Sequence, residues 1–360
     1  MKNRDVLEEQ KKTGVGRERL WTLPYMALIF LGTLISISFY MVMPLITKYV
    51  VQMGSTLAIA GVIVGMFSLV ALFVRPVSGI ISDRINKKFV FIASTILIGL
   101  SNIGYAISTS IALLVCFRVI HALAFSINGT VNLALAARYI PRDRIGEGIG
   151  YFGLGHIIAT AVGPALGIYI ENRYSPSLSF LIAGLVMLVV SLLMFMMPFT
   201  EQKNEKSKRE KIRIRVSDFI AVYILPFALF GGVFSMLNGV IGSYLILLGD
   251  ERGIGNMSLY FTINAISLIL VRTFAGKIYD KCGLSTVLVP AFVFAFIASL
   301  FIGYAQALPI VLIAAALKAF AQGSGQPAIQ AECIKLLPEK KIGVATSTYY
   351  IGADIGQGFG

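Results

Sequence analysis

The residues of this chain that could do chemistry are ionisable side chains inside long apolar segments. Arg118 and His121 lie one helical turn apart within residues 111–137, so a helix there would place both on one face. His156 lies within residues 148–170, and Asp354 is the only acidic residue well inside an apolar segment. Because intramembrane charges are costly and histidine titrates near physiological pH, these four residues are candidates for proton coupling.

Each candidate also has a purely structural interpretation. Arg118 is seven residues from the end of its segment, so its side chain could reach the polar surface instead. His121 and His156 could be hydrogen-bonded packing residues. Asp354 could be an ion-pair partner for one of two other cations inside apolar segments, Arg272 and Lys318. The residues alone leave both interpretations open.

The segments that carry these residues are long enough to cross a bilayer. The chain is 57% hydrophobic and 14% charged, whereas soluble domains average about 25% charged residues. A spanning helix needs roughly 20 apolar residues. Such runs occur at residues 21–46, 57–81, 89–109, 111–137, 148–170, 178–199, 219–248, 258–276, 286–306 and 309–334, and an eleventh begins near Ala345. Lipid cannot satisfy free backbone groups, and the runs lack the two-residue alternation of a barrel, so each is predicted to be a helix.

The net charge of +13 is distributed unevenly between the two sides of the predicted membrane. If the N-terminus is cytoplasmic, the cytoplasmic tail and loops carry 24 Lys and Arg residues. The outer loops carry three, and the remaining four, Arg75, Arg118, Arg272 and Lys318, lie within spans. This distribution follows the positive-inside rule, and it accounts for the basic isoelectric point without a nucleic-acid partner.

An internal repeat with an offset of 197 residues relates the two parts of the chain. Residues 75–86 align with residues 272–283, so that Asp83 falls on Asp280, and Gly146 falls on Gly343. The predicted fold is therefore an all-α integral membrane protein of two six-helix bundles, twelve helices in all. Its parts are a cytoplasmic tail (1–19), an N-terminal bundle (20–200), a cytoplasmic linker (201–217) and a C-terminal bundle (218–360).

The repeat also predicts where the second bundle stops. Gly360 aligns with Gly163, which lies in the middle of the fifth apolar segment. The 360 residues should therefore end within helix 11, and about 35–40 further residues would complete the second bundle at normal span length.

The loop after the second segment carries a motif, GIISDRINKK, formed around Gly79, Asp83, Arg84, Lys87 and Lys88. With the two bundles, it resembles the GxxxDRxGRK signature of the major facilitator superfamily, although Asn86 replaces the last glycine and Lys87 replaces arginine. The resemblance implies that Asp83 braces helix 2 against helix 11 in one gate state, with Arg84 and Lys87 in the charge network. Alternatively, these charges only fix the topology.

The fifth segment is rich in glycine, with Gly155, Gly163, Pro164 and Gly167 as its main features. It resembles the GxxxxxxxGxxxGPxxGG signature of the drug:proton antiporters of that family, with Ile168 departing from the last glycine. A bend at Pro164 and close packing at the glycines follow from the residue types. Simple tight packing without any meaning for transport direction is the alternative.

The resemblance also assigns further residues. Arg118 is similar to a family arginine linked to proton coupling, and helices 1, 4, 7 and 10 of the fold line the substrate cavity. Polar residues on those helices include Asn128, Asn132, Asn238, Lys318 and Gln322. A buried cation at Lys318 would favour anionic or zwitterionic substrates.

The sequence thus predicts a proton-coupled secondary transporter that exports small amphipathic molecules, with small-molecule substrate, protons and the lipid bilayer as partners. Proton-coupled uptake of a metabolite is the alternative, and a membrane sensor or scaffold is a third hypothesis. No enzyme motif occurs, and we expect no catalytic residue, no metal, no cofactor and no nucleic-acid partner. The expected setting is a monomer in the plasma membrane of a bacterium.

Overall fold

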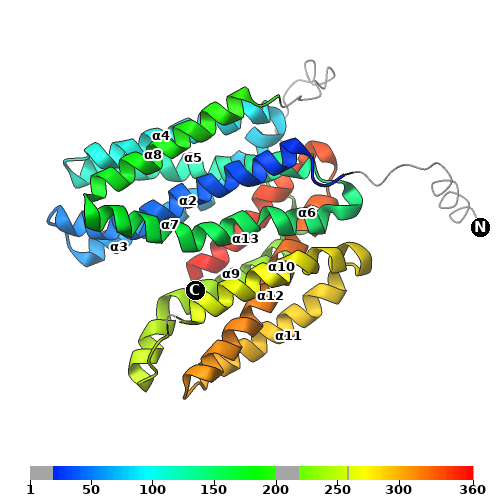
Figure 1. The fold of residues 1–360 in the computed structure, drawn as a ribbon. Helices are drawn as coiled ribbons and strands as arrows, with labels where there is room; N and C mark the ends of the chain where they lie inside the picture. Colours follow the sequence, from blue (N-terminus) through cyan, green and yellow to red (C-terminus); the bar gives the residue numbers. More distant parts are fainter. Residues whose placement is uncertain (1–18, 199–218, 258, 360) are drawn as a thin grey trace, which may run out of the picture.

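The computed structural model describes residues 19–198, 219–257 and 259–359, and all regular elements in these ranges are helices (Figure 1). The predicted linker and nearly all of the predicted N-terminal tail lie outside the described residues. Within the described part, ten helical stretches are long and apolar enough to cross a membrane. The predicted all-α membrane architecture is confirmed.

The first half of the chain forms α2 to α8. Their bounds are Leu23–Gln52 (α2), Leu57–Arg84 (α3), Lys87–Ile107 (α4), Ile111–Ala137 (α5), Ile145–Phe152 (α6), Leu154–Arg173 (α7) and Pro176–Met196 (α8). The second half forms Leu225–Arg252 (α9), Leu259–Cys282 (α10), Leu284–Gly303 (α11), Leu308–Lys335 (α12) and Ile342–Phe359 (α13). Short 3-10 turns precede α6 and α13, at Arg142–Arg144 and Glu339–Lys341, as expected for elements related by the repeat.

Side-chain caps start several of these helices. The side chain of Asn86 accepts a hydrogen bond from the backbone N–H of Phe89 at 2.9 Å, which satisfies one of the free donors at the start of α4. Thr56, Ser110 and Ser175 cap α3, α5 and α8 in the same way. The replacement of the family glycine by Asn86 therefore has a local structural reason.

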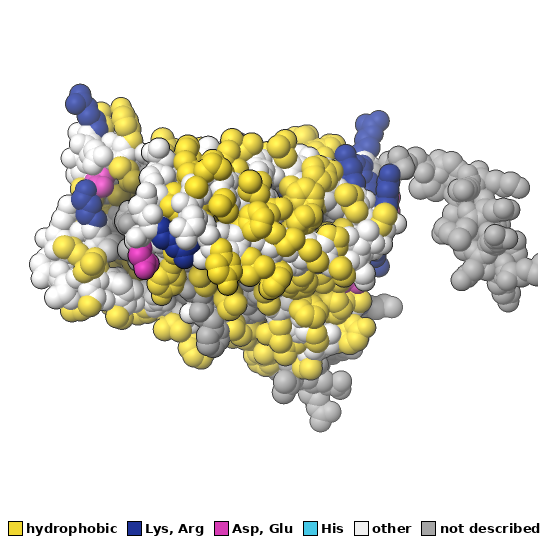
Figure 2. All heavy atoms as spheres, turned by 90° about the horizontal axis from the view of Figure 1, so that it is seen from below, with side chains coloured by type: hydrophobic (Ala, Val, Ile, Leu, Met, Phe, Trp, Pro, Cys, Tyr) yellow, Lys and Arg dark blue, Asp and Glu magenta, His cyan; other side chains and the backbone are white. Residues whose placement is uncertain are grey.

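The lateral surface is apolar, as a bilayer requires. Large hydrophobic side chains point outward, among them Phe73 with 78% of its surface exposed. Figure 2 shows hydrophobic side chains over the middle of the visible face, with Lys, Arg, Asp and Glu gathered toward the two ends. Exposed apolar area of this extent favours lipid rather than water as the solvent of the middle zone.

The interruption in the fifth predicted helix lies at Gly153, between α6 and α7. Pro164, where the sequence predicts a bend, lies inside α7, and the bend stays a prediction. The helices on the two sides of Gly153 have different packing partners. The short α6 packs against α10 of the second half, whereas α7 packs mainly against α2 of its own half.

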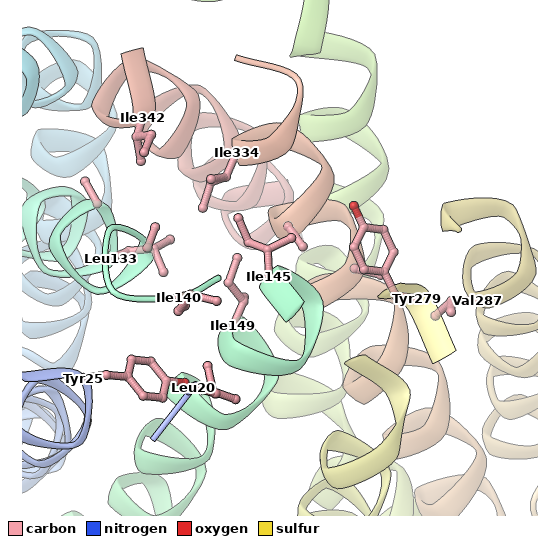
Figure 3. Close-up of a cluster of buried hydrophobic side chains, with 14 residues drawn as sticks. Leu20, Tyr25, Leu133, Ile140, Ile145, Ile149, Tyr279, Val287, Ile334 and Ile342 are labelled. Carbon is pink, nitrogen blue, oxygen red and sulfur yellow. The ribbon is translucent and has the colours of Figure 1, made fainter. Parts of the chain in front are cut away.

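The two halves meet at the end of the molecule where the loops 85–86, 138–144, 283 and 336–341 lie; we call it the basic end. At this junction α3 packs against α13 and α6 packs against α10. A cluster of buried side chains from both halves fills the junction (Figure 3), and it includes Leu133, Ile145, Tyr279, Ile334 and Ile342. Inside the same cluster, the Tyr25 hydroxyl donates to the carbonyl of Gly148 at 2.5 Å. The basic end is thus closed in this structure.

The backbone contact between α6 and α10 gives a first prediction. A Cβ atom on Gly276 would lie 2.6 Å from the Cα of Glu147, a distance that side chains essentially never adopt. We expect Gly276→Val to force α10 away from α6 and to cost about 1–3 kcal/mol, the usual range for overpacking. The thermal unfolding temperature in detergent should fall by several degrees.

Gly65→Val is the matched control, because a Cβ atom there meets nothing within 4 Å. Equal melting temperatures for the two variants would contradict the close approach of α6 and α10.

Candidate functional site

The first contact between the halves is made by Asp83 at the end of α3. Its carboxylate accepts hydrogen bonds from the backbone N–H groups of Gly343, at 2.7 Å, and Val344, at 3.0 Å. These are the first free donors of α13, and a helix N-terminus favours a negative charge. Gly79 permits this approach, since a Cβ atom on it would lie 3.1 Å from the Cα of Val344. The Asp83 contact thus joins α3 to α13, the predicted second and eleventh membrane helices, by charge-assisted hydrogen bonds.

A second contact of the same kind lies across the molecule. Asp280, at the end of α10, accepts hydrogen bonds from the N–H groups of Gly146 at 2.8 Å and Glu147 at 2.9 Å, at the start of α6. The repeat offset relates Asp280 to Asp83 and Gly146 to Gly343. The Asp280 contact was not among the predicted site residues, although the aligned aspartates were a signal that could have revealed it.

The charged residues around Glu147 extend the Asp280 contact. The buried Glu147 carboxylate pairs with Arg144 at 2.7 Å and lies 3.5 Å from the ammonium group of Lys277. At the surface nearby, Arg142 pairs with Glu339 of the other half at 3.2 Å. The second half of the repeat has Val344 in place of Glu147, so this network belongs to one side of the junction only.

The basic residues predicted for the same loop divide between two places. Lys87 is buried, donates to the carbonyl of Ser82 and acts through its charge on Asp83, as does Arg138. Arg84 is the last residue of α3. Lys88 instead donates to the carbonyls of Phe195 at 2.9 Å and Met197 at 2.7 Å. The Lys88 ammonium group therefore satisfies carbonyls at the C-terminal end of α8, where a cation is favourable.

Asp354 forms an ion pair that the sequence analysis did not foresee. Its carboxylate accepts a hydrogen bond from the Nε of Arg75 at 2.7 Å, so the pair joins α13 to α3 across the junction of the halves. The guanidinium group of Arg75 also lies 4.4 Å above the ring of Tyr350 and donates to the carbonyl of Ser126 at 3.2 Å. The partners considered from sequence, Arg272 and Lys318, were wrong.

Arg118 and His121 lie in an aromatic pocket inside the first half. Arg118 is fully buried, with its guanidinium group 4.5 Å from the ring of Phe67 and a hydrogen bond to the sulfur of Met43 at 3.3 Å. The possibility that Arg118 reaches the polar surface is therefore excluded. The Nδ1 of His121 lies 3.1 Å from the hydroxyl of Tyr105. These two residues do share a face, but they lie in a different place from Asp354.

His156 lies on the face of α7 that looks toward the second half. Its Nε2 is 3.1 Å from the hydroxyl of Tyr40 on α2, and the charge of Arg272 on α10 acts on its ring. The His156 side chain is nevertheless accessible to solvent. It is therefore an exposed side chain on the face of α7 that is directed toward α10. The four residues predicted for proton coupling are thus divided among three separate places.

The predicted helix 5 glycines face α2 rather than α10. Cβ atoms on Gly155, Gly163 and Gly167 would collide with Thr33, with Tyr40 and Ile37, and with Met41, respectively, all on α2. Pro164 lies inside α7 beside Gly163. The close packing predicted at these positions is present, but it holds α7 within its own half.

The predicted cavity residues also divide. The amide of Asn128 donates to the hydroxyl of Ser94 on α4 at 2.9 Å, so it is directed into the first bundle. Asn132 is buried with its Oδ1 unpaired, and a Cβ atom on Gly32 of α2 would lie 2.9 Å from its Nδ2. In the second half, Lys318 donates to Asn238, and Gln322 donates to Gln326 at 3.1 Å. Among the described residues, no group of three metal-ligating side chains occurs.

The two aspartate contacts give a second prediction. We expect Asp83→Asn and Asp280→Asn each to weaken the closed basic end, because hydrogen bonds to a charged group contribute about 1.5–3 kcal/mol. A bifunctional maleimide that links Arg142→Cys to Glu339→Cys measures closure, in a background with Cys116, Cys282 and Cys333 replaced. Each single change should lower the cross-linking yield severalfold, and the double change should lower it further.

Glu251→Gln serves as control, since Glu251 is exposed at the opposite end of α9. A yield that stays at the parental value in the double variant would show that the aspartates do not hold the halves together.

Comparison with known proteins supports the same architecture. The sequence model of the Major Facilitator Superfamily matches residues 28–360. An uncharacterized MFS-type transporter of Methanocaldococcus jannaschii is 24% identical over 91% of this chain and 86% of its own length. A multi-drug resistance efflux pump PmrA homolog of Lactococcus lactis is 24% identical over 85% of this chain and 78% of its own.

Two solved structures share the fold. The human organic anion transporter MFSD10 has a TM-score of 0.77 at 16% identity, covering 94% of this chain and 92% of its own. The Escherichia coli fucose:proton symporter FucP has a TM-score of 0.76 at 15% identity, covering 94% and 90%. The family match extends over nearly the whole sequence, and the fold, the repeat and the loop motif agree with it. This chain therefore belongs to the major facilitator superfamily of membrane transporters.

Proposed function

We propose that the protein is a proton-coupled antiporter that exports small amphipathic molecules. The observation that carries this proposal is the ion pair between Asp354 and Arg75, which joins the two halves inside the membrane-spanning region. Among the described residues, Asp354 is the acidic side chain that lies deepest within a predicted span. A carboxylate paired in this way can exchange its bond to a cation for a proton.

The pair links protonation to the position of the halves. When Asp354 is ionised, it attracts Arg75 and holds α13 against α3, together with the Asp83 contact. Protonation removes the negative charge, so the attraction that holds these helices weakens. The Asp354 side chain is 20% exposed, so a proton can reach it. Proton uptake would thus favour opening of the basic end.

This order of events fits exchange. A proton taken up from the opposite end opens the basic end, where the proton leaves and substrate binds. Once Asp354 is ionised again, it pairs with Arg75 and the basic end closes around the substrate, which departs at the opposite end. We place the basic end in the cytoplasm on the strength of its excess of Lys and Arg, so substrate moves outward. A path between its own two halves lets one chain act as a monomer in the plasma membrane.

The named relatives support export without deciding it. The efflux pump of Lactococcus lactis is similar over most of both chains, whereas the fucose:proton symporter shares the fold at 15% identity. Proton-coupled uptake therefore remains the competing function. In symport, the proton and the substrate would cross the membrane in the same direction.

The test uses the full-length protein in liposomes with an acidic lumen and a trapped pH dye, with ethidium and 2-naphthoate as external probes. Antiport predicts that the lumen becomes more alkaline when a transported probe is added, because protons leave as the probe enters. Asp354→Asn should reduce this proton flux at least tenfold. Asp143→Asn, a change of the same chemistry at an exposed position, should leave the flux unchanged.

The direction of the pH change separates the two functions. Further acidification of the lumen when the probe is added would mean symport and would refute export. Proton flux that survives Asp354→Asn would remove Asp354 from the coupling step, whichever direction is found.

A further inference from the structure

Arg272 lacks both of the partners that its repeat equivalent has. At the offset of 197 residues, Arg272 corresponds to Arg75. Arg75 is neutralised by Asp354 and covered by the ring of Tyr350. The residues of α6 and α7 that occupy the corresponding positions are Ile157 for Asp354 and Gly153 for Tyr350. The second arginine thus faces an apolar side chain and a residue with no side chain.

The structure places Arg272 against these two positions. A Cβ atom built on Gly153 would lie 2.8 Å from the Cζ of Arg272, so the guanidinium group occupies the space that a side chain there would fill. Ile157 packs against Leu268, which precedes Arg272 by one turn on α10. The spatial relation between α7 and α10 therefore repeats the relation between α13 and α3.

The charge of Arg272 is uncompensated. Its Nε is buried and has no hydrogen-bond partner, and no carboxylate of the described residues lies within 4.0 Å of it. The titratable side chains that interact with its charge are His156, Tyr349 and Tyr350, and none of them is an acid that is ionised at neutral pH. On α12, the cation Lys318 precedes Ala319, which packs against Ile157 and Leu268. An unpaired arginine in an apolar setting is costly and calls for an anion from elsewhere.

Polar groups and an approach to the site are present. His156, which is exposed, feels the charge of Arg272, and its Nε2 lies 3.1 Å from the hydroxyl of Tyr40. The imidazole and the phenol can donate hydrogen bonds to a ligand oxygen. Thr160 is exposed one turn farther along α7, on the same face as His156. A ligand that enters between the halves can therefore reach Arg272 past His156.

We propose that Arg272 binds the carboxylate of an anionic substrate, with His156 and Tyr40 beside it, so that the substrate takes the place that Asp354 occupies at the other arginine. The proposal rests on the proposed function only in using the space between the halves as the transport path. A guanidinium group and a carboxylate form paired hydrogen bonds, which makes a planar carboxylate the best match. The preferred cargo is then an organic acid with an apolar body.

The experiment measures the sign of the local charge and needs no transport. In full-length protein with Cys116, Cys282 and Cys333 replaced, Thr160→Cys is treated with two methanethiosulfonates of similar size, one sulfonated and one quaternary ammonium. The measured quantity is the rate of labelling by the anionic reagent divided by the rate of labelling by the cationic reagent. We expect this ratio to be higher for Thr160→Cys than for free cysteine in solution. Arg272→Gln should lower that ratio at least threefold.

The repeat supplies a sharper pair of variants. Ile157→Asp places a carboxylate beside Arg272, as Asp354 lies beside Arg75. This carboxylate should neutralise Arg272 and lower the rate ratio as Arg272→Gln does. Ile157→Asn has nearly the same shape without the charge and should keep the parental ratio. The asparagine variant also reports whether a polar group at this position disturbs folding.

Protection by a ligand completes the test. Addition of 2-naphthoate should slow the labelling of Thr160→Cys in the parent and in Ile157→Asn, but not in Ile157→Asp, and the neutral 2-naphthamide should have a much weaker effect. Equal protection by the acid and the amide would overturn the proposal. So would a charge preference that survives Arg272→Gln, or a cysteine that reacts with neither reagent. None of these outcomes bears on whether protons are exchanged.

Discussion

Charges inside a bilayer have to be compensated by the protein itself or by what it carries, because lipid offers no counter-charge and no hydrogen bond. The interior of this transporter is organised around that constraint. Four cations lie within predicted spans, namely Arg75, Arg118, Arg272 and Lys318. The surroundings of each cation differ. Arg75 has a carboxylate, Arg118 has aromatic rings and a sulfur atom, and Lys318 has an amide oxygen. Arg272 has a buried Nε without a hydrogen-bond partner and, among the described residues, no carboxylate within 4.0 Å.

At the closed end of the molecule, charged side chains are likewise compensated within the protein, in a more polar setting. Asp83 and Asp280 each satisfy two free N–H groups at the start of a helix in the other half. In both places a glycine allows the backbones to approach, Gly79 beside α13 and Gly276 beside α6. Hydrogen bonding, helix dipole and glycine packing act on the same few residues, next to the buried apolar cluster that both halves contribute to the junction.

Much of the fold could be predicted from the sequence, because membrane helices are encoded locally by length and hydropathy. The eleven apolar segments correspond to α2–α13 once α6 and α7 are counted as one, and the repeat gave the relation between the halves. Pairings between distant helices were harder. The partner of Asp354 was sought among Arg272 and Lys318, because no local pattern indicates which face of α3 meets α13. Asn128 was placed in the cavity from its helix alone, although its side chain turns toward Ser94. A fuller use of the repeat would have found the Asp280 contact, since both of its elements align with those of the Asp83 contact.

The doubled aspartate contact has a mechanical consequence. The halves of this fold are related by an axis along the membrane normal, so the two contacts lie on opposite sides of that axis. If one of them yields alone, the remaining one acts as a pivot, and the halves can only swing sideways about it. Separation of the halves along their whole width requires both contacts to break in the same passage. Loss of either contact alone would therefore leave the closed end held on one side of the axis only.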